Sequence, residues 1–397
     1  MGPQSSCSMR GFRTHPVFTC FRLNRVAGAM EIRALWPISK AVGRCRLSSR
    51  ASHVENPKLS FLMDIRYFIG VDISKATLDW AVFDGKIIVL QSQSANSEAG
   101  IKTTLKLIKA LPDFILANSV CCMEHTGIYN AHLLSYLRKI SLPIWLENSL
   151  QIKKSGGLQR GKNDAIDAQR IAEYAFRFRD QMRLWQPPRP VLQKLAALSA
   201  LRQRLLLVRQ QLQQPITEQQ GFIDSTLQKQ LAKSCQASLK AINADLEAAD
   251  KQINELIDQD DRLKELFTWI TSVPGVGSVT AAEVLVATDE FKAITDPKKL
   301  ACHAGVAPFE YKSGSSVRGK TRVNRHARLR LKSLFHLGAM SAIRMKGELQ
   351  DYYTRKVGEG KNKMLVLNAV RNKLIHRVCS VVHRQQKYDK NYTPTLA

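Results

Sequence analysis

Four acidic residues in three short motifs carry the clearest chemical signal in this chain. They are Asp72 in GVDISK, Glu124 in CCMEHTGIY, and Asp164 and Asp167 in GKNDAIDAQRIAEYA. Asp72 lies inside an apolar run, which is an unfavourable place for a solvated acid. Asp164 and Asp167 are three residues apart, so a helix places both on one face. Carboxylates at strand ends and on one helix face can therefore converge into a cluster.

A carboxylate cluster needs a positive charge, because neighbouring carboxylates oppose each other's ionisation. A hard divalent cation with oxygen ligands meets that need, and Mg²⁺ bound in this way serves phosphoryl chemistry on nucleic acids. Each acid also has a plainer interpretation, since most acids are solvated and Asp164 could charge a helix N-terminus. The apolar setting of Asp72 favours the metal cluster.

The segment YKSGSSVRGKTR is a second candidate for chemistry. Small Ser and Gly residues among fixed cations make a loop that can approach a phosphodiester. A serine hydroxyl there could attack phosphorus if a base or a metal takes its proton. The alternative is a flexible loop whose serines only bond the backbone, and the residues alone favour this alternative.

The serine segment lies in a run of cations without acids. From Tyr311 to Gly347 the chain contains ten Lys/Arg residues and no Asp or Glu. A solvated charged face normally carries both positive and negative residues. A run of positive residues alone therefore predicts contacts to phosphates. The residues that we expect to bind nucleic acid are Lys312, Arg318, Lys320, Arg322, Arg325 and Arg328.

Upstream of the basic run, SVPGVGSVTAAEVLVA has the pattern of a helix-hairpin-helix element. Gly275 and Gly277 allow a tight turn, and the N-terminus of the next helix can offer amide N–H groups to a phosphate. A structural turn explains PGVG nearly as well. The neighbouring basic run is what favours nucleic-acid binding by these two glycines.

Composition supports a nucleic-acid partner. The chain has 397 residues, with 60 Lys/Arg against 33 Asp/Glu and a net charge of +27, a field that suits a polyanion. Membrane spanning is disfavoured, because no run of about 18 apolar residues occurs. The eight cysteines form no CxxC pair, so neither a zinc site nor a disulfide framework is indicated, and a reducing cytoplasm fits.

Residues 1–62 differ from the rest of the chain. They hold ten Lys/Arg and two Glu residues and show no helical or strand period. They could be a transit-like segment or translated upstream DNA, and we favour the second interpretation because Met63 stands just before the first convincing strand. The segment carries a charge of +8, so its removal leaves +19.

The elements that must position the four acids form an α/β pattern over residues 63–185. Three strands and then alternating helices and strands give the order of a ribonuclease-H-like sheet, in which the first strand and its acid are central. The expected strands are 67–73, 78–83, 86–91, 119–123 and 143–146, and the expected helices are 97–110, 129–140 and the segment that carries Asp164 and Asp167.

The remainder of the chain is expected to be mainly helical. The stiff segment WQPPRP ends the first domain, and residues 190–266 show leucine-rich heptads interrupted by Pro215. These heptads predict coiled-coil seams, or alternatively an ordinary packed helical hairpin, and they do not separate internal packing from dimerisation. A third region covers residues 267–347, and residues 348–397 are expected to form a basic helical tail.

The whole set of motifs resembles one family. GVDISK, EHTGIY, KNDAIDAQRIAEYA, VPGVGSVTAAEVLVAT, AGVAP and SGSSVRGKTRVNRHARLR follow an order that is similar to the DEDD transposases of the insertion-sequence one-ten family, which are related to the Piv/MooV DNA invertases. The likeness spans residues 67–344 and leaves residues 1–62 without a counterpart. Where members often have Gly residues, this chain has VNRHARLR, with Asn324 and His326.

The resemblance implies a fold and a mechanism. It implies a RuvC-like N-terminal domain that binds Mg²⁺ through Asp72, Glu124, Asp164 and Asp167, and a C-terminal transposase domain with a nucleophilic serine. That serine precedes a glycine, which points to Ser313, with Ser315 and Ser316 close by. Cleavage would form a covalent serine–DNA intermediate in a homo-oligomer, a dimer or tetramer whose protomers complete one site.

The resemblance also implies an RNA partner. A bridge RNA from the element's own ends would pair with donor and target DNA in the bacterial cytoplasm, at the nucleoid. Base pairing can then select the DNA sequence, while the protein contacts the sugar–phosphate backbones of the nucleic acids. Two other functions fit fewer features. A RuvC-like nuclease using water would need the acids but not Ser313, and a non-catalytic nucleic-acid-binding scaffold would need neither.

Overall fold

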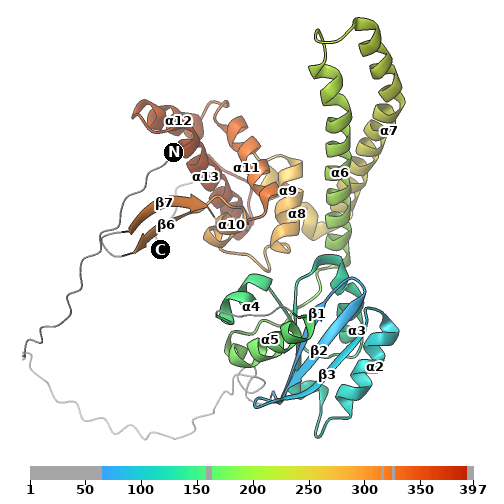
Figure 1. The fold of residues 1–397 in the computed structure, drawn as a ribbon. Helices are drawn as coiled ribbons and strands as arrows, with labels where there is room; N and C mark the ends of the chain where they lie inside the picture. Colours follow the sequence, from blue (N-terminus) through green and yellow to red (C-terminus); the bar gives the residue numbers. More distant parts are fainter. Residues whose placement is uncertain (1–64, 158–162, 314–316, 324–326, 391–397) are drawn as a thin grey trace, which may run out of the picture. The chain divides into compact units, whose positions relative to one another are not determined.

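The computed structural model describes residues 65–390 except 158–162, 314–316 and 324–326 (Figure 1). Ser315, Ser316 and Arg325, together with Asn324 and His326, therefore lie outside the described residues. The described chain forms an α/β sheet domain, a long helical hairpin and a mainly helical C-terminal region. None of the described helices combines the length and the apolar character needed to cross a membrane.

The sheet domain confirms the expected α/β pattern with the first strand at the centre. Its five strands lie in the order β3-β2-β1-β4-β5; β1 pairs antiparallel with β2 and parallel with β4. Their bounds are β1 (Tyr67–Ile73), β2 (Thr77–Phe83), β3 (Ile88–Ala95), β4 (Ser119–Glu124) and β5 (Ile144–Glu147).

Strand β3 differs from the expected 86–91. It begins at Ile88 and continues through the polar sequence QSQS to Ala95, with every second side chain from Gln91 onward exposed. The apolar run stops at Leu90, so hydrophobicity alone ends the strand too early. Pairing with β2 extends it, because an edge strand needs only one buried face.

The two faces of the sheet carry different helices (Figure 1). Successive β1 side chains point to opposite faces. Tyr67, Ile69 and Val71 pack into a core with helices α2 (Glu98–Lys109) and α3 (Ala131–Lys139). The alternate positions Phe68, Gly70 and Asp72 face helix α5 (Asp164–Arg177): the Phe68 ring packs against Phe176, and Gly70 touches the α5 backbone. This alternation places Asp72 on the α5 face of the sheet.

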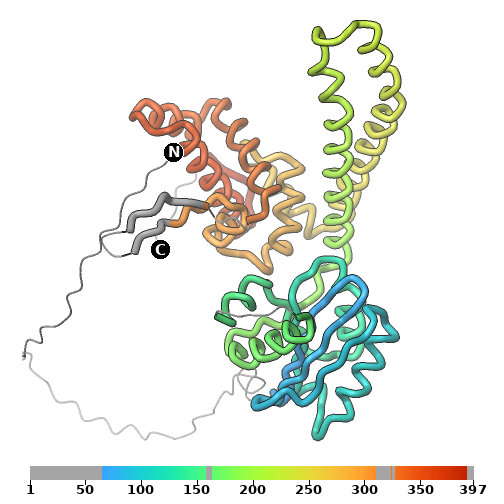
Figure 2. The backbone as a smooth tube through the Cα atoms, viewed as in Figure 1, coloured from blue at the N-terminus to red at the C-terminus, as the bar shows by residue number. Residues whose placement is uncertain are grey.

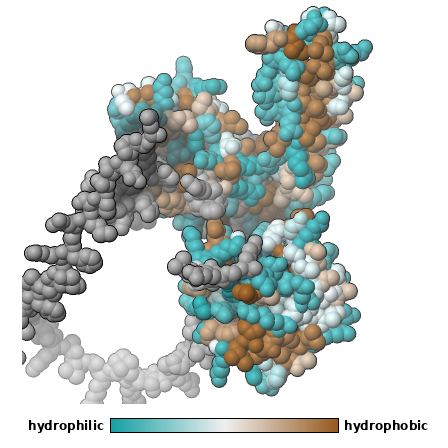
Figure 3. All heavy atoms as spheres, in the orientation of Figure 1, coloured by the Kyte–Doolittle hydropathy of each residue, from teal (hydrophilic) through white to brown (hydrophobic). Residues whose placement is uncertain are grey.

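Residues 190–258 form a helical hairpin, in which α6 (Pro190–Glu218) and α7 (Ser225–Asp258) run antiparallel (Figure 2). The expected break at Pro215 is wrong, since α6 continues through this residue and the chain reverses after Gln219. Packing against α7 outweighs the hydrogen bond that Pro215 cannot donate. Leu207 and Phe222 are among the apolar side chains that remain exposed. Figure 3 shows hydrophobic residues, in brown, on the surface of the hairpin.

The C-terminal region shares one hydrophobic core with the base of the hairpin. Helix α13 buries ten residues, so the expected tail after residue 347 is in large part structural. The described residues of the expected loop YKSGSSVRGKTR, 311–313 and 317–322, lie instead in two antiparallel strands. The elements are α8 (Asp261–Thr271), α9 (Ser278–Thr288), α10 (Pro297–His303), β6 (Pro308–Ser313), β7 (Val317–Val323), α11 (Leu329–Ala342), α12 (Glu348–Gly358) and α13 (Lys363–Arg384).

Candidate metal centre and nucleic-acid interface

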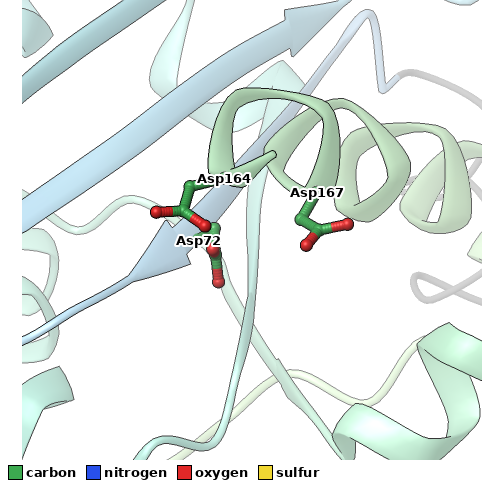
Figure 4. A group of neighbouring side chains, drawn as sticks. All are labelled: Asp72, Asp164 and Asp167. Atoms are coloured by element: carbon green, nitrogen blue, oxygen red, sulfur yellow. The ribbon is translucent and has the colours of Figure 1, made fainter. Parts of the chain in front are cut away.

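Three of the four predicted acids meet in space. One carboxylate oxygen from each of Asp72, Asp164 and Asp167 lies within 4.8 Å of the others. Figure 4 shows Asp164 next to Asp72, with Asp167 further along the same helix; Asp72 comes from β1, and the other two acids come from α5. The helix begins at this point because Asn163 caps it, accepting a hydrogen bond from the Ala165 amide at 3.1 Å.

Small residues bring α5 close enough to β1 for this meeting. A Cβ atom at Gly70 would lie 2.2 Å from the carbonyl oxygen of Ala168 and 2.3 Å from the amide nitrogen of Ala172. Ala81 on β2 packs against the same two alanines. A larger side chain at any of these contacts would force the helix away from the strand, and with it the two acids of its first turn.

Asp72 lies in an electrostatically unfavourable setting. Burial and, next, the charge of Asp164 raise the pKa of the Asp72 carboxyl above its usual range. The Ile73 amide donates a hydrogen bond to Asp72 at 3.1 Å and opposes this shift in part. The buried Asp79, opposite Asp72 on β2, adds further repulsion while it accepts a hydrogen bond from Gln93 at 3.0 Å. A cation at the cluster would relieve this repulsion.

Glu124 lies beside the cluster rather than within the group of three. It is the last residue of β4 and is half-buried. Burial raises the pKa of its carboxyl, the charge of Lys153 opposes that shift, and Asp72 and Asp167 add to it. The turn after Glu124 is fixed by the buried Asn130, whose side chain donates to the Glu124 carbonyl at 2.8 Å.

Two residues outside the predicted set lie next to the acids, one in contact with Asp167 and one opposite Glu124 in the sheet. Arg170 donates a hydrogen bond to Oδ1 of Asp167 at 2.7 Å. In the sequence NDAIDAQR, the spacing of three residues between Asp167 and Arg170 could have indicated this contact, because residues three apart are neighbours on a helix. Glu147 ends β5 next to Glu124 in register and accepts a hydrogen bond from the Tyr174 hydroxyl at 3.3 Å. Only the sheet order brings Glu147 to this edge.

The residues present fit a hard divalent cation. Mg²⁺ binds oxygen at about 2.0–2.1 Å in an octahedron, which puts ligand oxygens roughly 3 to 4 Å apart. Three carboxylate oxygens within 4.8 Å of one another reach that arrangement with small side-chain rotations. Oxygen-only donors and the raised pKa of Asp72 agree with this chemistry.

The predicted serine lies in the β6–β7 hairpin. Ser313 is the last residue of β6 and pairs with Val317. The adjacent register pair is Lys312 and Arg318, two of the residues predicted to bind nucleic acid. Lys320 and Arg322 follow Arg318 at alternate positions of β7. The backbone thus concentrates the cations on the ribbon that carries the serine.

Arg328 has an internal role that its sequence context did not indicate. Its Nη2 atom lies 2.6 Å from Oε1 of Glu283, although off the direction of a hydrogen bond. Arg330 Nε lies 3.1 Å from the other oxygen. Glu283 is only 2% exposed and is the one charged residue of helix α9, so it requires these partners. Phosphate binding by Arg328 stays a prediction.

The two predicted glycines differ in their surroundings. Gly275 has a φ of +90°, and a Cβ there would lie 2.7 Å from the Gly338 carbonyl oxygen on α11. Gly275 is therefore needed for the turn and its close packing. Gly277, the N-cap of α9, is exposed and has open space around it. Of the two, Gly277 is the one where a phosphate could approach the helix N-terminus.

Comparison with known proteins identifies similar sequences over both regions. Residues 69–219 match a family model for DEDD transposases of the IS110 type, described as "Transposase". Residues 268–354 match the model "Transposase IS116/IS110/IS902 family". A pilin gene-inverting protein of Moraxella bovis is 26% identical over 330 residues, which cover 81% of this chain and 98% of that protein. An uncharacterized 44.8 kDa protein of insertion element IS116 from Streptomyces clavuligerus is 35% identical over 31% of this chain and 29% of its own length.

Proposed function

Because this chain belongs to the IS110-type transposases, enzymes of DNA recombination, we propose that it cuts and rejoins DNA with Mg²⁺ and a serine nucleophile. The DNA would comprise the ends of an insertion sequence and a target site. The convergence of Asp72, Asp164 and Asp167 is the observation that carries this proposal, because three such carboxylates would suit a cation that serves phosphoryl transfer.

The residues of the cluster would hold the cation and fix its surroundings. Asp72, Asp164 and Asp167 would be ligands, and Glu124 would join them directly or through water. When bound, the cation would neutralise charge that develops on a phosphate oxygen. Arg170 holds Oδ1 of Asp167, which leaves the second oxygen of that carboxylate for the cation.

The serine step would exchange one ester bond to phosphorus for another, so that the phosphate stays a diester throughout. The Ser313 oxygen would form a bond to phosphorus while the bond from phosphorus to one deoxyribose oxygen breaks. The serine proton would pass to a base, and the released oxygen would take up a proton. Attack by a hydroxyl of another DNA end on the phosphoserine would rejoin the DNA and return the serine. Lys312 and Arg318, paired beside Ser313, would stabilise the phosphate charge.

The proposed partners follow from charge and family. A net charge of +27 supports binding of DNA and of a noncoding bridge RNA that chooses the sites by base pairing. The printed name of the Moraxella bovis relative describes inversion of a gene, a DNA rearrangement. We further propose a homo-oligomer, a dimer or tetramer, that acts at the nucleoid in the bacterial cytoplasm.

A covalent-adduct assay tests the mechanism. Protein starting at Met63 is incubated with Mg²⁺, the element's noncoding RNA and labelled DNA that spans an element end, and is then denatured. We expect DNA that migrates with protein, and its loss in Ser313→Ala and Asp72→Ala but not in the matched controls Ser315→Ala and Ser316→Ala. Cleaved DNA without an adduct would indicate a nuclease that uses water. Binding without either product would indicate a scaffold.

A further inference from the structure

A cavity of about 460 Å³ lies beside the acid cluster. Glu124 of β4 and Asp167 of α5 line it, together with residues of α4 (Ser149–Ser155), the following two glycines and further residues of α5. Pockets of roughly 300–1,000 Å³ accept ligands of the size of a single nucleotide. The cavity is too small for a duplex, so its occupant next to a DNA-cleaving centre would be one nucleotide.

One wall of the cavity is apolar and rigid. Ile152, Ile171 and Tyr174 line it and are all at least nine-tenths buried. The Tyr174 ring is held by its hydroxyl, which donates to Glu147, and by the Trp145 ring at 5.3 Å between centroids. Apolar and aromatic walls of this kind accept the face of a base without reading its sequence.

The charged part of the lining contains one cation whose charge is available. Arg170 is paired with Asp167, and Arg177 is paired with Glu173. Lys153 also lines the cavity, is exposed, and has no ion pair among the described residues. It lies close enough to Glu124 to act on that carboxyl. A phosphate next to the acid cluster would therefore meet Lys153 first.

We propose that this cavity holds the nucleotide adjacent to the scissile phosphate. Its base would lie against Ile152, Ile171 and Tyr174, and Lys153 would bind a phosphate oxygen. The proposal rests on the proposed function, since it assigns a subsite to the same metal centre. It requires an unpaired nucleotide, because a base within a duplex cannot enter a pocket of this size.

A matched pair of lysines tests the phosphate contact. Lys153 and Lys154 are neighbours on α4, both exposed, and only Lys153 lines the cavity. We expect Lys153→Ala to weaken binding of a short fluorescent single-stranded oligonucleotide by about fivefold or more, as for loss of one charge-assisted contact. Lys154→Ala should change binding less than about twofold. Equal effects of the two substitutions would overturn the assignment of Lys153.

A base analogue tests the pocket itself without requiring cleavage. DNA carrying 2-aminopurine at successive positions around the expected cleavage site is titrated with the protein and its RNA. Fluorescence should rise at one position, because a base that leaves the stack loses quenching. Ser155→Phe, which fills the cavity from the end of α4, should abolish that rise. Retained thermal stability of the variant would show that it folds.

The outcomes separate this proposal from the proposed function. A position-specific rise that Ser155→Phe removes, in a protein that forms no serine adduct, would support the pocket and reject the serine mechanism. Adduct formation without any position-specific rise would support the mechanism and reject the pocket. A rise that persists in Ser155→Phe would also reject the pocket, since the base would then lie elsewhere.

Discussion

At the scale of single residues, the acids of the four-member motif have different positions. Asp72, Asp164 and Asp167 form the tight group, while Glu124 flanks it next to Lys153. Burial and neighbouring carboxylates raise the pKa of Asp72, and they also raise the pKa of Glu124, where the charge of Lys153 opposes the shift. Without a cation these features cost the folded state free energy when the carboxyls are ionised, and a bound cation reverses that cost.

Asp72→Asn should abolish stabilisation by Mg²⁺. A ligand present at ten times its Kd stabilises the folded state by about 1.4 kcal/mol. We expect an increase in the melting temperature of the parent protein as Mg²⁺ is added, and none in the variant. Without metal, the variant should be at least as stable as the parent, because it removes a repelled charge. Asp180→Asn, an exposed acid outside the cluster, should retain the full Mg²⁺ effect.

The Mg²⁺ effect should depend on pH. The pKa values of Asp72 and Glu124 are raised in the folded state, so that state holds protons more strongly than the unfolded chain. Without metal, these two groups favour folding at low pH, and their contribution is lost as the pH rises through the folded pKa values. Mg²⁺ competes with those protons. We expect its effect on melting to fall as the pH is lowered from neutral toward the raised pKa values of these two carboxyls. An effect that stays constant until the protein unfolds in acid would contradict the assignment.

At the scale of elements, the contact between β1 and α5 builds the site. Gly70→Ala would put a methyl group against backbone atoms of Ala168 and Ala172. Overpacking costs roughly 1–3 kcal/mol, and a clash with backbone lies at the upper end or beyond. We expect a lower melting temperature and weaker Mg²⁺ binding together. Gly358→Ala, at an open helix position, should leave both unchanged. Intact Mg²⁺ binding in Gly70→Ala would refute this account.

The turn before α9 allows structure and nucleic-acid binding to be separated. Gly275→Ala should destabilise the protein, because φ is +90° and the Gly338 carbonyl fills the space. Gly277→Ala should leave the free energy of unfolding within about 0.5 kcal/mol of that of the parent. If the N-terminus of α9 binds a phosphate, Gly277→Ala should weaken DNA binding severalfold in a filter-binding assay. Unchanged binding would restrict the turn to a structural role.

At the scale of the whole molecule, charge should dominate binding. The logarithm of the affinity for DNA falls with the logarithm of salt concentration, with a slope of about −0.9 for each phosphate neutralised. Lys312→Ala with Arg318→Ala should reduce that slope by about 2 units. Lys102→Ala with Lys106→Ala, on exposed positions of α2, is the matched control and should not change the slope.

Since residues 1–62 carry only +8 of the net charge, protein that starts at Met63 should keep most of the slope.

The sequence by itself determined strand β1 and the shared helix turn of two of the candidate metal-binding acids. Strand β1 was predicted with its observed bounds, because buried apolar residues in a short run leave little choice of structure. Asp164 and Asp167 lie in the first turn of one helix, as their spacing indicated. These features depend on residues that are neighbours in the chain, so local pattern is sufficient to predict them.

Only the tertiary structure decided which groups meet. The sequence could not show that Gly70 admits α5, that Glu124 stands outside the group of three, or that Arg328 is paired with Glu283. It also gave no sign of the cavity beside Asp167. Each of these depends on contacts between segments far apart in the chain, and such contacts are fixed by packing and by the burial of charge rather than by local preference.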